Sequence, residues 1–351
     1  MAIEDDDVRD REVWTAVSRH WYSRANDKAP TTGRLYHHLA ILARSDIVGQ
    51  LFYYAKSLCI PIPFNSARDS ILTLSEPIMS GTGKLHAVDR ALVRCHGTFF
   101  TGKGTEDLEE ARNEFLSSLD LAMAKSARRW LESGYQMAVT NLCALLDYDI
   151  STKIFMKALD ASTKAPSRPK IVADEQASAE FQAAPSEPTK SLDSDDEPVP
   201  NSTTEAEVDM EILQFVESTD TIVLSPLGDL NILSYLNVRL MFLHQMSVLK
   251  GPGGAVPPAM SHLEDSFPWH LLTLCLNSFA VGFETPKYEI REFPPTAERR
   301  PLPENWAMRG LVWAEMAFPV DHFTVNENMK EDERTFETQL YASFLLRYGV
   351  G

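Results

Sequence analysis

Residues 18–43, SRHWYSRANDKAPTTGRLYHHLAILA, decide the fold that the sequence predicts. Ser18, Tyr22, Ala25 and Pro30 follow the spacing A-x3-F-x2-A-x4-P, with serine in the small first position. This is the pattern of the second half of a tetratricopeptide-like repeat. Small residues let two helices approach closely, an aromatic ring fills the space beside them, and proline ends the helix.

A second helix follows at once. Gly33 supplies a turn, and from Arg34 onward apolar residues recur at helical spacing, at Tyr36, Leu39, Ala40 and Ala43. A third helix, residues 51–58, ends before Pro61 and Pro63. A two-helix unit cannot bury its apolar face alone, so further helices must stack on it. The stretch therefore predicts an all-α, tetratricopeptide-like stack (an α-solenoid), with Tyr22 and Leu39 in its core.

Apolar periodicity extends this prediction along the chain. The predicted helices are 9–29, 64–79, 84–100, a helix capped by Thr105 and running through Leu119, then 131–148, 227–249, 258–282, 304–318 and 329–348. Short turns join most of them, which favours a helical architecture over a sheet. In the first helix Val13, Val17, Trp21 and Ala25 share one face. A repeat would place another helix before it, so we expect this edge of the stack to be apolar and exposed.

Residues 161–209 differ from the rest of the chain. Alanine, serine, proline, threonine and acidic residues dominate the segment, and apolar residues are sparse. Such a composition buries too little surface to offset the entropy of ordering. It predicts a disordered acidic insertion between two helices.

Composition narrows the class of protein. The chain of 351 residues carries a formal net charge of −17, which argues against broad nucleic-acid binding. Its four cysteines, Cys59, Cys95, Cys143 and Cys275, are widely spaced and fit buried reduced thiols better than disulfides or zinc. The acidic opening does not resemble a signal peptide, and no apolar run is long enough to cross a bilayer. An intracellular soluble protein without membrane association is expected.

The sequence carries no complete catalytic motif, which favours a protein that is not an enzyme. Residues 97–104, GTFFTGKG, approach a phosphate-binding loop, but glycine stands where the loop needs serine or threonine, and a helix precedes it. His37, His38 and His96 lack partners at metal spacing, and His96 is expected to pack or cap. The sequence predicts no catalytic residue, no metal site and no cofactor.

Several segments carry a resemblance to a known family. They are WYSRA at 21–25, APTTGRLYHHLAILA at 29–43, FYYAKSL at 52–58 and the residues through Arg68, then RCHGTFF at 94–100, TNL at 140–142, LNSF at 276–279, and LPE at 302–304 with Arg309-Gly310. In these segments the chain resembles the ever-shorter-telomeres (Est-type) DNA/RNA-binding family. That family includes telomerase regulators and the Smg-type adaptors of nonsense-mediated mRNA decay.

The resemblance implies an organisation and a function. Tetratricopeptide-like repeats would occupy 1–80, and a helical hairpin domain would occupy 81–160 and 210–351. The implied function is a non-catalytic scaffold in mRNA decay or telomere maintenance, in the nucleus or the cytoplasm. Its partners would be decay or telomerase proteins, with weak binding of single-stranded RNA or DNA. The family's phosphoserine pocket lies upstream of the matching residues, so none of its residues is assigned here. The alternative is a protein-interaction solenoid without a nucleic-acid role.

One candidate ligand site follows from the repeat register. The first helix of each tetratricopeptide unit lines a groove, and counting from Pro30 places Arg34, His37, Ile41 and Arg44 there. Spacings of three, four and three put them on one helical face. Two guanidinium groups beside a histidine suit an acidic or phosphorylated peptide, because guanidinium binds such oxygens in bidentate fashion. The alternative is a solvated polar face of an amphipathic helix.

Overall fold

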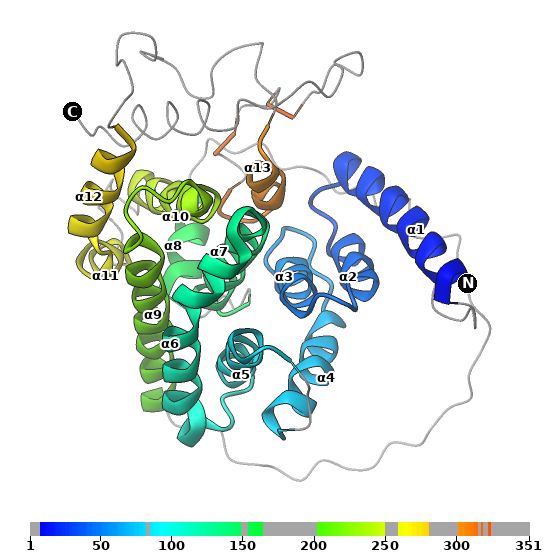
Figure 1. Ribbon diagram of the computed structural model, residues 1–351, viewed down its shortest axis with the longest axis horizontal. Helices are drawn as coiled ribbons and strands as arrows, with labels where there is room; N and C mark the ends of the chain where they lie inside the picture. The colour runs from blue at the N-terminus through cyan, green and yellow to red at the C-terminus, as the bar shows by residue number, and fades with distance from the viewer. Residues whose placement is uncertain are drawn as a thin grey trace.

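The computed structural model describes residues 8–81, 85–148, 154–163, 202–249, 259–280, 301–314, 317–318 and 322–323. Throughout this part of the chain the regular elements are helices, and the β-type pairing is a single bridge between Thr32 and Ile62. The predicted all-α class is therefore confirmed (Figure 1). None of the helices in the described ranges combines the length and apolarity that a membrane span requires.

The helices follow one another as packed neighbours. They are α1 Val8–Lys28, α2 Gly33–Leu42, α3 Ile47–Leu58, α4 Ala67–Met79, α5 Ala87–Thr101, α6 Leu108–Ser126, α7 Trp130–Leu145, α8 Ile154–Thr163, α9 Ser202–Leu224, α10 Leu233–Val248, α11 Ala259–Ser266, α12 Trp269–Ala280 and α13 Pro303–Met308. Each of α1 to α5 packs against the next helix, and α7 then packs against both α3 and α10. Figure 1 shows α1 at the outer edge of this stack, beside α2.

The first turn of the stack forms as its sequence predicts. Helix α1 ends at Lys28, just before Pro30, and α2 begins at Gly33. A Cβ atom on Gly33 would lie 2.6 Å from the backbone nitrogen of Phe64, so only glycine allows this close approach. Leu39 is buried in the core, as predicted, while Tyr22 is half-buried against it.

Three predicted elements are wrong in detail. The predicted helix 258–282 is replaced by two helices, α11 Ala259–Ser266 and α12 Trp269–Ala280, because Pro268 interrupts the apolar run. The predicted helix 304–318 ends at Met308, because the backbone leaves the helical region at Arg309, with ψ 132°, and at Gly310, with φ +85°. Thr105 does not cap α6 but starts a short 3-10 turn, and α6 begins at Leu108.

The predicted insertion is bordered by helices that reach past its expected limits. Helix α8 extends to Thr163 and α9 begins at Ser202, so residues 161–163 and 202–209 are helical. The central part of the predicted disordered segment, residues 164–201, lies outside the described residues. The predicted helix 329–348 also lies outside them.

The segment around α13 packs against α2 and α3, near the beginning of the stack. The amine of the fully buried Lys56 donates to the carbonyl oxygen of Ala307 at 2.5 Å and to that of Trp306 at 3.4 Å. The Tyr36 hydroxyl donates to the Pro30 carbonyl at 3.0 Å. Burial lowers the pKa of Lys56 to about 7. The two bonds of Lys56 join residues about 250 positions apart in the sequence.

A buried histidine joins α5 to α7. His96 is fully buried, and its Nε2 lies 3.0 Å from the amide oxygen of Asn141 while its Nδ1 lies 3.0 Å from the Tyr148 hydroxyl. These partners fit a neutral ring that donates from Nε2 and accepts at Nδ1. Burial lowers the pKa of His96 to about 4. The packing role predicted for this histidine is confirmed.

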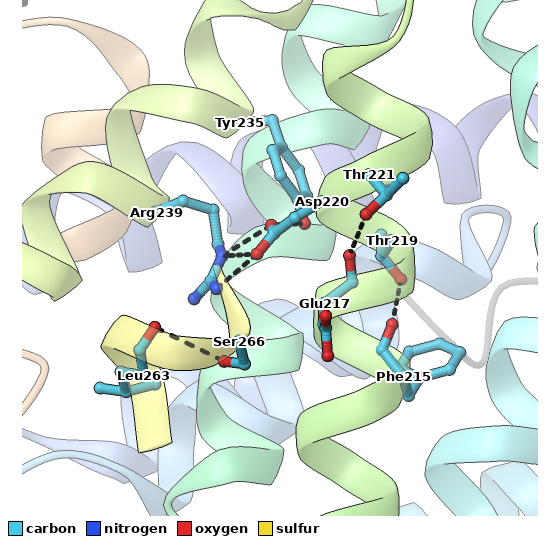
Figure 2. A network of polar contacts seen from close by, with 9 residues as sticks. All are labelled: Phe215, Glu217, Thr219, Asp220, Thr221, Tyr235, Arg239, Leu263 and Ser266. Atoms are coloured by element: carbon cyan, nitrogen blue, oxygen red, sulfur yellow. Dashed lines mark hydrogen bonds and ion pairs between the residues drawn. The ribbon is translucent and has the colours of Figure 1, made fainter. Parts of the chain in front are cut away.

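A buried ion pair joins α9 to α10 (Figure 2). The guanidinium of Arg239 donates to both carboxylate oxygens of Asp220, at 2.6 to 3.1 Å. Tyr235 donates to the same carboxylate at 2.7 Å. Asn141, the partner of His96, is close enough to Tyr235 to act on the pKa of its hydroxyl. Polar groups thus continue through the core from α5 to α10.

Truncating the core of the first repeat should destabilise the whole chain. Leu39 is 3% exposed. We expect Leu39→Ala to lower the free energy of unfolding by about 2–5 kcal/mol, through lost burial and the remaining cavity. Chemical denaturation followed by circular dichroism measures the change. Leu121→Ala is the matched control, because Leu121 is 57% exposed on α6 and its truncation should have little effect. Equal stability of the two variants would refute the repeat register.

His96 should make the fold sensitive to acid. Its pKa is about 4 in the folded chain and about 6.5 when exposed, so below pH 6.5 the unfolded chain binds a proton that the folded chain does not. The stability that this group contributes is complete above pH 6.5 and is lost as the pH falls toward 4, by up to about 3 kcal/mol. Unfolding of the parent and of His96→Gln, measured from pH 7 to pH 4, should show a shallower decline in the variant. Parallel curves would contradict this assignment.

The ion pair should show strong coupling between its two members. Asp220→Ala leaves the Arg239 charge buried without its carboxylate, and we expect a loss of about 3–5 kcal/mol in the free energy of unfolding. Asp220→Leu combined with Arg239→Met removes both charges and should cost much less than the sum of the single changes. A double-mutant cycle in denaturant measures the coupling, and additive single effects would rule it out.

Candidate functional site

The predicted site lies on the outer strip of α2. His38 turns toward α1, where its ring stacks on Tyr22 with centroids 4.8 Å apart. His37 turns toward α4, where its Nε2 lies 3.0 Å from the Ser70 hydroxyl. The strip between these two histidines carries the exposed Arg34 and the half-buried Ile41. Arg34, His37 and Ile41 thus lie on one face of α2.

Arg44, the fourth predicted residue, lies outside α2. Helix α2 ends at Leu42 with Ala43 as its C-cap, so Arg44 lies in the following turn and not on the helical face that the spacing predicted. Its guanidinium is close enough to Tyr54 on α3 to lower the pKa of that phenol, although burial has the larger effect and raises it. Arg44 is exposed.

The positive charge of the site comes from its arginines. The pKa of His37 is lowered first by burial and then by His38 and Arg34, so the imidazole is neutral at physiological pH. The same effects, burial and Arg34, lower the pKa of His38. Neither Arg34 nor Arg44 has a carboxylate within ion-pair distance among the described residues. Both remain available to an oxyanion from outside.

Two residues of the site were missed by sequence reasoning. Ser70 contacts His37, and Tyr54 lies 5.4 Å from the His37 ring, measured between centroids. Their contribution depends on how α3 and α4 pack against α2, which no local pattern shows. Tyr54 lies close enough to Arg44 to feel its charge, and a hydroxyl group beside a guanidinium group suits the binding of phosphate or carboxylate oxygens. Among the described residues no group of three histidine, cysteine or acidic side chains is placed to hold a metal.

A hollow next to the site has the opposite character. Its volume is about 700 Å³. The residues that line it begin directly after Arg44 in the sequence; they are Ser45, Asp46, Ile47, Leu85, His86, Asp89 and Arg90. Arg90 is paired with Glu114 on α6, and burial raises the pKa of Asp89. Two carboxyl groups make this hollow a poor place for a phosphate, so the strip on α2 is the better anion site.

Charge is unevenly divided along the chain. Residues 18–148 contain 15 lysines and arginines against 13 aspartates and glutamates, a formal charge of +2. The remaining residues contain 18 against 37, a formal charge of −19. The low overall pI therefore reflects the residues outside 18–148. The acidity of the whole chain is therefore no reason to exclude nucleic-acid binding by residues 18–148, which hold the site.

The same region is the part of the chain that matches a known family. Residues 18–148 match the family described as the Est1 DNA/RNA binding domain. The match runs from the middle of α1 through α7, and it includes Arg34, His37, Ile41 and Arg44 as well as His96 and Asn141. It agrees with the resemblance carried by the segments at 21–68, 94–100 and 140–142. Over residues 18–148 the chain is therefore similar to the Est1 DNA/RNA binding domain family.

Proposed function

We propose that this protein is a non-catalytic, Est-type helical scaffold that binds single-stranded RNA or DNA through residues 18–148. The observation that carries the proposal is the family match over this region. The region's formal charge of +2, beside −19 in the rest of the chain, supports the same residues as the nucleic-acid-binding part. Binding is expected to be weak at physiological salt, because few phosphates are neutralised and little counterion is released.

The strip on α2, together with Arg44 in the turn that follows the helix, is the proposed phosphate contact. Arg34 and Arg44 are exposed and have no ion-pair partner among the described residues. Guanidinium groups bind phosphate oxygens in bidentate fashion. A solvated polar face without unpaired cations would offer no such contact. The same two groups suit an acidic or phosphorylated peptide of a protein partner, so the scaffold can use one strip for either kind of anion.

The cellular role that we propose is nonsense-mediated mRNA decay or telomere maintenance, in the nucleus or the cytoplasm. The resemblance of the 21–68 segments to telomerase regulators and Smg-type adaptors supports this role. Co-purification of mRNA decay factors or of telomerase components would separate the two processes. Incubation of labelled RNA with manganese and the protein should leave the RNA intact, and cleavage would contradict the non-catalytic assignment.

Reversing the charge of the strip should weaken nucleic-acid binding. We expect Arg34→Glu with Arg44→Glu to reduce the affinity for a fluorescein-labelled 20-nucleotide U20 RNA or dT20 DNA by about tenfold or more at 50 mM salt, because two phosphate contacts become repulsive. The salt dependence of the binding constant should also become shallower. Fluorescence anisotropy measures both quantities.

The control for this experiment is a matched charge reversal elsewhere. Arg128 and Arg129 are exposed and adjacent in the 3-10 turn before α7. Arg128→Glu with Arg129→Glu changes the net charge by the same amount and should reduce binding much less. Equal losses in the two variants would show that bulk charge, and not the α2 strip, governs binding. Absence of binding by the unaltered protein at 50 mM salt would refute the proposed function.

A further inference from the structure

The outer face of α1 carries large apolar side chains in solvent. Val13, Trp14, Val17 and Trp21 are 60%, 42%, 42% and 66% exposed, as the sequence predicts for the edge of the stack. The other side of α1 packs against α2, where Tyr22 stacks on His38 and Arg19 donates to the carbonyl oxygen of Leu42. Two tryptophans left in water on a short stretch of one helix mark an interaction surface.

Basic side chains follow the tryptophans along the same face of α1. Residues 14, 17, 21, 24 and 28 are separated by three, four, three and four positions, so Trp14, Val17, Trp21, Arg24 and Lys28 lie in one row along α1. Arg24 and Lys28 are exposed. Neither has a carboxylate within ion-pair distance in the part of the chain that the structure describes. The imidazole of His20 lies against the Trp21 indole, with ring centroids 5.5 Å apart.

This row combines the two features that bind single-stranded nucleic acid. Indole rings stack on bases of any sequence, and guanidinium or ammonium groups neutralise the phosphates. Seven residues of helix separate Trp14 from Trp21, about 10 Å along the axis. A stacked strand rises about 3.4 Å per nucleotide, so a strand that follows α1 brings bases about three nucleotides apart to the two indoles. A purely apolar row would instead suit the packing of another helix, but two of the five residues in this row, Arg24 and Lys28, are basic.

We propose that the row from Trp14 to Lys28 is a base-stacking surface for single-stranded RNA or DNA. Trp14 and Trp21 contact bases, and Arg24 and Lys28 contact the phosphates that follow. The inference rests on the proposed function and adds to it, because the strip on α2 supplies phosphate contacts alone. The row begins before residue 18 and so extends beyond the residues that match the family.

The test compares aromatic and charged variants by anisotropy with labelled U20 and dT20. Trp14→Ala with Trp21→Ala should lower the affinity of the full chain by about tenfold or more while the salt dependence stays unchanged, because no charge is lost. Trp14→Tyr with Trp21→Tyr keeps two aromatic faces and should retain most of the binding. Arg24→Glu with Lys28→Glu should weaken binding and also reduce the slope of log affinity against log salt by about one or more.

Controls separate the possible failures. Leu121→Ala removes an exposed apolar side chain on α6 and should bind like the parent. Circular dichroism should show that the tryptophan variants keep the helical content of the parent. If the parent binds and the double alanine variant binds equally well, the stacking surface is refuted while the proposed function stands. If the parent binds neither oligonucleotide, both are refuted.

Two further measurements would detect a different binding partner for this face of α1, namely a second copy of the chain or another protein. Light scattering coupled to size exclusion measures the mass of the parent and of the double alanine variant. A parent dimer that becomes a monomer in the variant, with no change in oligonucleotide affinity, would assign the row to self-association. Binding of an acidic amphipathic helical peptide that U20 does not displace would assign it to a protein partner. Either result overturns the proposal.

Discussion

The amine of Lys56 is the contact on which the arrangement of this protein most depends. It lies inside the first repeat and donates to the carbonyl oxygens of Trp306 and Ala307 at the end of α13. The last carbonyls of a helix lack partners within the helix, and a cation or a donor there satisfies them. The Tyr36 ring covers the amine, with its centroid 4.3 Å away. Without this donor, α13 would end in the core with unsatisfied carbonyl groups.

Polar groups in the core connect helices that are distant in the sequence. His96 and Asn141 join α5 to α7, and Asp220 and Arg239 join α9 to α10. A buried polar group needs a partner in one specific place, whereas apolar surfaces can slide past each other. One continuous apolar core extends from Tyr36 to Ala317 around these groups. The segments on both sides of residues 164–201 therefore contribute to the same core, and the polar contacts fix their register.

Local signals explain what could be predicted from the sequence. Pro30 and Gly33 mark a turn that needs only neighbouring residues, so the first two helices and the burial of Leu39 were predictable. The end of α2 was not, because Ala43 terminates the helix without a glycine or a proline. That single position moved Arg44 from the helical face into a turn. Of the candidate site, Arg34, His37 and Ile41 were placed by periodicity, while Ser70 joined them through tertiary packing.

The role of Lys56 could not be predicted at all, since its partners lie about 250 residues away in the sequence. Its burial also has a thermodynamic consequence. A lysine in the unfolded chain is fully protonated at pH 7, but in the folded chain its pKa is about 7. Folding near neutral pH therefore favours the release of a proton from this one side chain. The heat of folding accordingly contains a contribution from the buffer that takes up the proton, and the contribution of this side chain to stability increases as the pH rises from 7 toward 10.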